Sequence, residues 1–509
     1  MDETSADGVA SSMPMTACHV MFPAFRRRRA ELMSTRPANQ AFPSRPSRLV
    51  PTARELKDLL RLAVPVVVVQ VGIMLMGVVD SIMVGHLSAN ALASVALGNM
   101  YFMGLAIFGM GVLLALDPLV AQAVGAGDHT AIARALQRGL VLALVLSVPC
   151  GALLLTVDPV LSAIGEPPEL IPYASLFTSI MIPSVVPFFG FIVFRQTLQA
   201  LGRMRAIVTT IVLANLLNAL LDWVLIFGHL RAPAMGVAGS AWATTVSRWA
   251  MLVGLMALSW KDLRPHLLPL RPELGQWHPL VRMFGLGLPI GLQFILEWGV
   301  FGTVMMLMGR LGTIPVAAHQ IAINVASLTF MVPLGVSAAA AVLVGHAVGR
   351  GDAEGAVREA RAALAIGVAF MSAMALLLLV LPVPIAQLYT RDAAVIALAA
   401  VLLPIAGAFQ IFDGIQVVSV GILRGLADTR APFVIAVLGF WLLGFPVSLW
   451  LGFRTALGAA GLWWGLVVGL VAVAALLLFR VRARFRREIG RVHVDEPAAA
   501  SSAGVTSAA

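Results

Sequence analysis

Two short motifs decide the fold of this chain. Residues 124–128 read VGAGD and residues 348–352 read VGRGD, each close to the end of a long apolar run. The motifs lie 224 positions apart, and the same offset relates Pro65 to Pro289 and the GHL at 85–87 to the GRL at 309–311. A constant offset at three separated places indicates two homologous halves, a common architecture among membrane transporters.

The composition of the 509 residues points to a membrane protein. Hydrophobic residues make up 60% and charged residues 12%, whereas soluble domains carry about 25% charged residues. This excludes a soluble enzyme, a disordered scaffold and a nucleic-acid-binding domain, and the net charge of +10 reflects basic residues between apolar runs. The two cysteines, Cys18 and Cys150, give neither a disulfide framework nor a cysteine metal site.

The apolar runs predict twelve transmembrane helices, because a helical span needs about 20 apolar residues. We expect these helices at 60–84, 91–123, 132–156, 170–195, 206–228, 237–258, 283–308, 315–344, 356–381, 394–423, 432–451 and 457–479.

The basic residues predict the orientation of the spans. Of the 35 lysines and arginines, thirty fall in the two tails, in the even-numbered loops or near the span ends that adjoin them. One, Arg248, lies inside a span, and the other side carries only Arg231, Arg310, Arg391 and Arg454. Cytoplasmic loops carry an excess of Lys and Arg, so both termini are expected to be cytoplasmic.

Six spans per half place the two halves in the same orientation, related by an axis along the membrane normal. The predicted fold is an all-α integral membrane protein with twelve transmembrane helices in two six-helix bundles related by a parallel pseudo-two-fold repeat. In such proteins the substrate site lies between the bundles. The expected parts are a disordered cytoplasmic N-tail (1–55), an N-terminal bundle (56–258), a cytoplasmic linker (259–282), a C-terminal bundle (283–480) and a disordered cytoplasmic C-tail (481–509).

Five acidic residues fall inside the predicted spans. A charge near the bilayer centre costs at least about 2.5–3.5 kcal/mol, so such residues usually serve a function in a wet interior. The other half of the repeat lacks an acid at the equivalent positions, which indicates that the fold does not require them. They are Asp80, Asp117, Asp222, Glu297 and Asp413.

In the first half, Asn215, Asn218 and Asp222 lie on one face of the span at 206–228. Asp80 reaches a similar depth on the first span, so Asp80, Asn218 and Asp222 are predicted to form a carboxylate–amide cage. Its oxygens suit a hard cation, and the two carboxylates are equally suited to sharing a proton.

In the second half, each acid has amides on its own helical face. Gln293 precedes Glu297 by four residues, and Gln410, Asp413 and Gln416 are spaced by three. This pattern predicts a polar-lined substrate cavity, with satisfied interhelical hydrogen bonds as the alternative.

Three further residues carry weaker predictions. Pro65 precedes Asp80 by fifteen residues on one helix, and a proline kink there is a candidate hinge; its repeat mate Pro289 makes a purely architectural kink an equal alternative. Asp117 lies beside Pro118, and a structural role in satisfying backbone groups is as well supported as a functional one. We interpret His319 as a packing residue rather than a proton relay.

The sequence contains no signature of nucleotide hydrolysis. The two lysines follow Leu56 and Trp260, so a phosphate-binding G-K-[ST] loop is excluded, and there is no H-E-x-x-H. We therefore expect that the protein is not an enzyme and has no cofactor, and that an ion gradient is the energy source for transport.

Five stretches of the sequence match motifs of a known family. They are MGVVDSIMVGHLS (76–88), VAQAVGAGD (120–128), GLPIGLQFILEWGVF (287–301), VAAHQIAINVASLTFMVPLGVSAAAAVLVGHAVGRGD (316–352) and FDGIQVVSVGILRGLADTR (412–430). Over roughly residues 55–480 the sequence thereby resembles the multidrug and toxic compound extrusion (MATE) family, in its bacterial NorM-type branch. That family's fold has twelve spans in two parallel bundles, and its members export cationic, amphipathic drugs and metabolites in exchange for Na⁺ or H⁺.

The resemblance also implies roles for individual residues. Asp80 matches the family's first-helix cation-site aspartate, and Asn218 and Asp222 match its fifth-helix polar pair. Glu297 and Asp413 match the second-bundle acids tied to cation coupling or drug binding. The NorM-type branch often has an amide in place of Asp222, and the DinF-type branch generally lacks the second-bundle pair; this chain has both sets, which leaves the location of the coupling cation open.

The expected function is secondary active multidrug efflux in the bacterial inner (plasma) membrane. A cavity open to the cytoplasm loads a cationic amphipath, and the coupling Na⁺ or H⁺ neutralises the carboxylates and releases it outside. The expected partners are such small molecules and the lipid bilayer, with no nucleic acid, no permanently bound metal and a monomeric protein. A lipid-linked precursor flippase and an organic acid exporter of the same superfamily are alternatives. The flippase would need a basic cavity and usually extra spans, and the organic acid exporter is disfavoured by the acidic cavity, since Arg248 is the one cation expected inside the spans. A channel or receptor would need no gradient-coupled carboxylates.

Overall fold

The computed structural model describes residues 52–492 and Asp495, and in this part of the chain the secondary structure is entirely helical. The helices are α2 (Ala53–Gly85), α3 (Ala89–Leu113), α4 (Leu116–Ala126), α5 (His129–Leu154), α6 (Val157–Ile164), α7 (Ile171–Met181), η1 (Ile182–Ser184), α8 (Val185–Ala200), α9 (Met204–Phe227), α10 (Val237–Leu258), α11 (Trp260–Leu267), η2 (Pro272–Gly275), α12 (Trp277–Leu311), α13 (Thr313–Gly349), α14 (Ala353–Val380), α15 (Pro382–Gln387), α16 (Ala393–Gly425), α17 (Arg430–Ala436), η3 (Val437–Gly444), α18 (Phe445–Phe453) and α19 (Gly458–Phe485).

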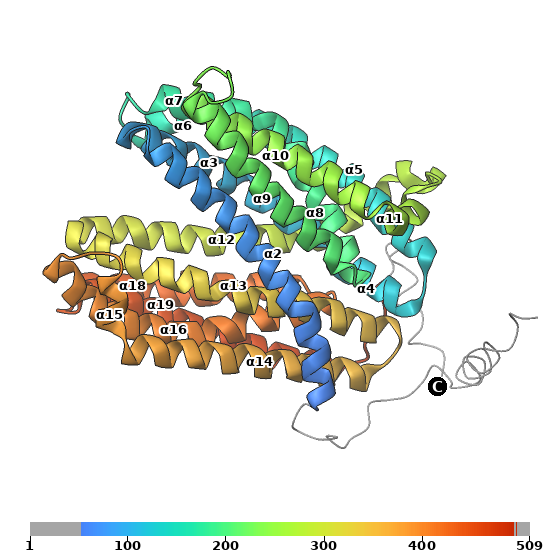
Figure 1. The fold of residues 1–509 in the computed structure, drawn as a ribbon. Helices are drawn as coiled ribbons and strands as arrows, with labels where there is room; N and C mark the ends of the chain where they lie inside the picture. The colour runs from blue at the N-terminus through green and yellow to red at the C-terminus, as the bar shows by residue number, and fades with distance from the viewer. Residues whose placement is uncertain (1–51, 493–494, 496–509) are drawn as a thin grey trace, which may run out of the picture. The chain divides into compact units, whose positions relative to one another are not determined.

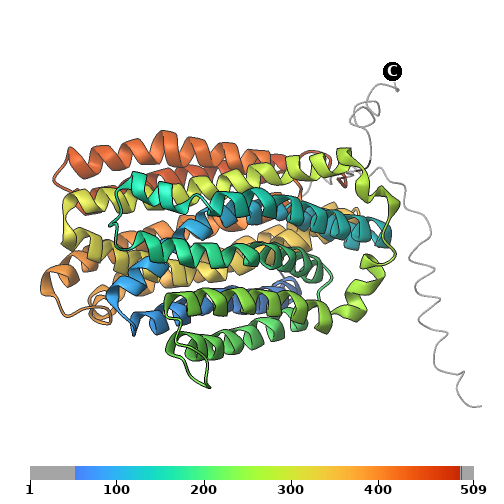
Figure 2. The same ribbon diagram turned by 90° about the horizontal axis from the view of Figure 1, so that it is seen from above.

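The twelve predicted spans are confirmed. Within the described residues, 12 helical segments are long and apolar enough to cross a membrane, and the long helices run roughly parallel to one another (Figure 2). Three spans are composite: α3 continues into α4, α7 into α8 through η1, and α17 into α18 through the π-helical η3. Large apolar side chains face outward, among them Val148, Leu216 and Leu442, as expected for a surface in contact with lipid.

The two bundles have separate hydrophobic cores. One core is built from residues between Val66 and Met283, and the other is built almost entirely from residues between Val300 and Val481. Figure 1 shows the helices from α3 to α10 on one side and those from α13 to α19 on the other. The predicted division into two six-helix bundles is therefore what the chain adopts.

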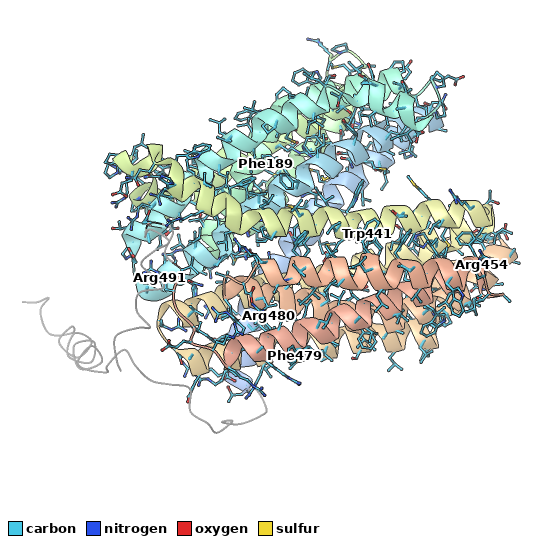
Figure 3. All side chains as sticks on the ribbon, turned by 180° about the vertical axis from the view of Figure 1, so that it is seen from behind. Phe189, Trp441, Arg454, Phe479, Arg480 and Arg491 are labelled. Atoms are coloured by element: carbon cyan, nitrogen blue, oxygen red, sulfur yellow. The ribbon has the colours of Figure 1, made fainter. Side chains whose placement is uncertain are left out.

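Alternate helix junctions lie at one end of the bundles, which we call the basic end. The junctions α4–α5, α8–α9, α13–α14 and α16–α17 lie there, with arginines in or near them, including Arg203, Arg350 and Arg430. Figure 3 shows Arg480 and Arg491 toward this end and Arg454 at the opposite one. The ribbons of the two bundles lie closest at the basic end and diverge toward the opposite end (Figure 1).

The repeated VGxGD motif is explained by its place at the basic end. A Cβ on Gly125 would overlap the His346 carbonyl, and a Cβ on Gly349 would overlap the Gln122 carbonyl, so these glycines let α4 and α13 approach backbone to backbone. The second glycine of each motif, Gly127 and Gly351, has φ +70°, which ends the helix.

The aspartate of each motif begins the next helix. Asp128 caps α5 by accepting a hydrogen bond from the Ala131 amide at 2.9 Å, and Asp352 caps α14 through the Gly355 amide at 2.7 Å. Both capping bonds satisfy amides that a helix start otherwise leaves unpaired.

Helix α2 changes bundles at Pro65. Leu59 and Ala63, before the proline, belong to the core of the C-terminal bundle, whereas Val66 and Val69, after it, belong to the core of the N-terminal bundle. The blue ribbon of α2 crosses from one bundle to the other in Figure 1. The predicted hinge residue therefore lies where one helix passes between two bodies.

Helix α12 repeats this arrangement in the second half. Met283, before Pro289, packs in the core of the N-terminal bundle, and Val300, after it, packs in that of the C-terminal bundle. The pseudo-two-fold repeat thus extends to the crossing helices.

The linker and tails differ from the predicted boundaries. Residues 259–282, predicted as a linker between the bundles, contain α11, η2 and the first turns of α12. The predicted disordered C-tail is wrong for its described residues, because α19 runs to Phe485 and the Val492 amide donates to Gln122 Oε1 at 2.9 Å. Arg491 and Asp495 also form ion pairs with the N-terminal bundle. Residues 1–51 of the predicted N-tail lie outside the described residues.

Candidate functional site: a cavity between the bundles

A cavity of about 290 Å³ lies between the bundles. Its apolar wall includes Phe294, Trp298, Phe301 and Phe330. Its polar lining comes from α2, α4, α8, α12 and α16, and consists of Gln70, Asp117, Arg195, Gln196, Gln199, Glu297 and Arg424.

Direct contacts between the bundles close the cavity at the basic end. Gln122 donates a hydrogen bond to the Gly425 carbonyl at 3.0 Å. His346 Nε2 lies 2.8 Å from the Ala200 carbonyl oxygen. An ion pair joins Arg424 to Asp117 at 3.2 Å. The structure therefore shows the state in which the arginine-rich end is shut, instead of the cytoplasm-open state expected for loading.

Glu297 is the predicted coupling residue that lines the cavity. Its Oε1 accepts hydrogen bonds from Gln293 at 2.9 Å and from Gln416 at 2.7 Å. Asp413, on the same helix as Gln416, lies within electrostatic range of Glu297. The structure thus brings together four of the predicted residues, and the two amides orient one oxygen of the Glu297 carboxylate beside the cavity.

The four residues predicted to line the substrate cavity have other places. Gln293 and Gln416 are buried beside Glu297, and Gln410 donates to Thr329 Oγ1 at 2.6 Å. Asn215 donates to the Ile211 carbonyl of its own helix at 2.9 Å. None of these four is among the residues that line the 290 Å³ cavity.

A second acidic cluster is buried within the N-terminal bundle. Asp80 Oδ2 accepts a hydrogen bond from Thr244 Oγ1 at 3.0 Å, and the side chains of Asn218 and Asp222 are close enough to interact with its carboxyl. The predicted cage is therefore assembled. Asp80 Oδ1 and both polar side-chain atoms of Asn218 and of Asp222 lack a well-formed hydrogen bond within the described part of the chain. Such buried, unsatisfied oxygens are suited to binding a cation or a proton.

The cage lies beside the buried Arg248. This guanidinium donates to Ser184 Oγ at 2.9 Å and stacks over Phe102 and Phe188 at 4.2 and 5.0 Å from the ring centroids. No cluster of three or more His, Cys, Asp or Glu suited to a metal ion occurs in the part of the chain that was described.

Two basic residues of the cavity are not predicted from the sequence. Arg195 and Arg424 each lie at the end of an apolar run, a position typical of a loop, yet both line the cavity, and Arg424 is 6% exposed. The expectation that Arg248 is the one cation inside the spans is wrong. A signal was available in the repeat, where QALGRMRA at 199–206 aligns with RGLADTRA at 424–431 and so pairs Gln199 with Arg424, both now found in the cavity wall.

Asp117 and His319 are also placed by the structure. Asp117 is 2% exposed, accepts a hydrogen bond from Gln196 and pairs with Arg424 across the bundles. His319 is buried and its ring lies 5.6 Å from that of Trp463, a contact that fits the packing interpretation.

Twelve spans in two bundles around a largely apolar inter-bundle cavity with a few charged groups in its wall define the class of secondary transporters. The MatE family model matches the chain twice, over residues 65–224 and 289–450. The chain therefore belongs to the MatE family, and the double match confirms the internal repeat.

Relatives agree with this assignment, and a solved structure shares the fold. A probable multidrug resistance protein NorM of Mesorhizobium japonicum is 39% identical over 84% of this chain and 93% of its own length. A multidrug resistance protein NorM of Burkholderia vietnamiensis is 37% identical over 84% of this chain and 94% of its own length. The crystal structure of the eukaryotic MATE transporter AtDTX14 superposes with a TM-score of 0.78 at 22% identity, covering 85% of this chain and 98% of that one.

Proposed function

We propose that this multidrug efflux transporter exchanges cationic amphipathic molecules for Na⁺ or H⁺. The observation that carries the proposal is the Glu297 carboxylate at the wall of a largely apolar cavity, held by two amides and flanked by Asp413. A carboxylate in a low-dielectric site attracts a positive group strongly, and the neighbouring phenylalanine and tryptophan rings suit a flat apolar body.

Coupling follows from competition for the same negative charge. A Na⁺ or H⁺ that reaches the Glu297–Asp413 pair or the Asp80–Asn218–Asp222 cage removes the attraction for the cargo. Two carboxylates so close together bind a proton or a cation more readily than one alone. The relatives' name as multidrug resistance proteins supports export as the direction of transport.

The orientation follows from the positive-inside rule. With the basic end in the cytoplasm of a bacterial inner membrane, both tails are cytoplasmic and the observed state faces outward, ready to release cargo. Movement to the inward-facing state separates α4 from α13, and the crossing points at Pro65 and Pro289 supply the bends. The protein acts as a monomer in this mechanism, since each chain holds a complete cavity.

Ethidium efflux from proteoliposomes tests the proposal, with Na⁺ and pH gradients imposed separately. Glu297→Gln keeps the size and the amide contacts but removes the charge, so uphill efflux is expected to fall to background. Glu273→Gln is the matched control, because Glu273 lies in η2 outside the spans, where it pairs with Arg134 near the start of α5, and efflux should continue. Full ion-coupled efflux by E297Q, D413N and D80N alike would refute the mechanism.

A further inference from the structure

We call the part of the cavity wall formed by Asp117, Arg195, Gln199 and Arg424 its floor. This floor carries more positive than negative charge. Arg195 on α8 and Arg424 on α16 both line it, with Asp117 on α4 as the carboxylate between them. Arg424 pairs with Asp117 at 3.2 Å, while Arg195 donates to the neutral Gln70 Oε1 at 3.0 Å. One guanidinium is therefore in excess.

Several hydrogen-bond donors at this floor have no acceptor. The Nε groups of Arg195 and Arg424 and the Nε2 group of Gln199 are buried without a hydrogen-bond partner among the residues that the structure describes. Arg424 and Gln199 are only 6% and 2% exposed. Buried donors normally find partners, and a charged one left unpaired is costly.

The missing partner is best matched by a carboxylate. A singly charged anion balances the one excess guanidinium, and two carboxylate oxygens accept from the forked donors of arginine. The Asp117–Arg424 pair needs only one arginine to join the bundles, and Gln122 and His346 join them as well. Arg195 is therefore not needed for the contacts that hold the two bundles together.

The cavity as a whole is bipolar. Its ionisable lining consists of Arg195, Arg424, Asp117 and Glu297, which sum to zero when both acids are ionised. A purely cationic cargo pairs with Glu297 and leaves the floor uncompensated. A cargo with one amine and one carboxylate satisfies both poles, with its apolar body against Phe294 and Trp298.

We propose that Arg195, Gln199 and Arg424 form a carboxylate-binding subsite, so that the preferred cargo is a zwitterionic amphipath. This inference rests on the proposed function for the place where cargo binds. It adds a positive pole at the floor, which the negative pole at Glu297 does not imply.

The test compares two dyes that differ only in the carboxylate. Rhodamine B carries a cation and a free carboxylate, and its ethyl ester carries the same cation alone. Binding of both to the purified protein in nanodiscs is measured by fluorescence anisotropy. We expect the wild type to bind rhodamine B about tenfold or more tighter than the ester, the range for hydrogen bonds between charged groups.

Arg195→Gln is expected to remove that preference by weakening rhodamine B alone, with the ester's Kd unchanged. Arg203→Gln is the matched control, since Arg203 pairs with Asp262 at the basic end. If R195Q binds neither dye, Gln199→Met is used in its place. This variant removes a neutral donor from the same floor and should reduce the preference for rhodamine B over its ester severalfold.

Equal binding of the two dyes by the wild type, or an unchanged preference in both floor variants, overturns the subsite and leaves the cluster an inter-bundle salt bridge. Because this experiment measures binding, it tests the subsite independently of ion-coupled efflux. Loss of coupled ethidium transport with the dye preference intact refutes the proposed function alone.

Discussion

Replacing Asp117 by asparagine is expected to open the basic end. Asp117 and Arg424 are 2% and 6% exposed and belong to different bundles. Removing one partner of a buried ion pair costs about 3–5 kcal/mol. The substitution destabilises the closed state and not the open one, because Asp117 and Arg424 are already apart when the bundles separate. Asparagine has the size of aspartate and still accepts the hydrogen bond from Gln196, so we use the lower end of this free-energy range. About 3 kcal/mol shifts the equilibrium toward the open state roughly hundredfold.

Labelling of a buried cysteine measures this shift. Ala121 is fully buried where α4 meets Gly345 of α13, so Ala121→Cys in a chain without Cys18 and Cys150 reacts with a polar maleimide only when the bundles part. In nanodiscs we expect D117N to raise the labelling rate at least about tenfold, a conservative reading of the population shift. Asp428→Asn is the matched control, because Asp428 pairs with Arg480 inside one bundle. Equal labelling rates in D117N, D428N and the unmodified background would refute the reasoning.

Three further predictions follow from named contacts. Thr244→Val removes the one well-formed hydrogen bond that Asp80 receives from the described residues and should lower the free energy of unfolding by about 1–3 kcal/mol, measured by thermal unfolding in detergent; no change in Tm would show that other groups already satisfy Asp80. Pro65→Ala restores a backbone donor where α2 passes between bundles and should slow ethidium turnover without changing ethidium affinity, whereas an unchanged rate contradicts the hinge. Burial by itself raises the pKa of Asp128, but the Ala131 amide, Arg491 and Arg134 outweigh it, so its pKa lies below the ordinary value. The contribution of this ion pair is therefore complete above the unfolded pKa of about 3.9 and is lost as pH falls through the folded value. The Tm difference between wild type and Asp128→Asn, which keeps the helix cap, should be constant from about pH 5 to 9 and shrink only in stronger acid; a decline near neutral pH would refute it.

The cage around Asp80 was predictable, but the inter-bundle floor was not. Asn218 and Asp222 share a helical face, and span direction gives their depth, so their meeting with Asp80 follows from helix geometry. Glu297 with Gln293 follows in the same way from a four-residue spacing. The contacts of Arg195 with Gln70 and of Arg424 with Asp117 join helices whose relative rotation no local pattern specifies.

The spans, their alternation, the repeat and the family can all be predicted from the order of the residues alone. These depend on hydrophobic length, on charge at the ends of spans and on motifs such as VGAGD, each of which is written in consecutive residues. Three features emerge only from the packed fold: the points where α2 and α12 change bundles, the end that is closed, and the two arginines that face the cavity. The physical reason is that packing between helices sets their rotation and depth, and a residue at the end of an apolar run lies in water or between bundles according to how its neighbours approach.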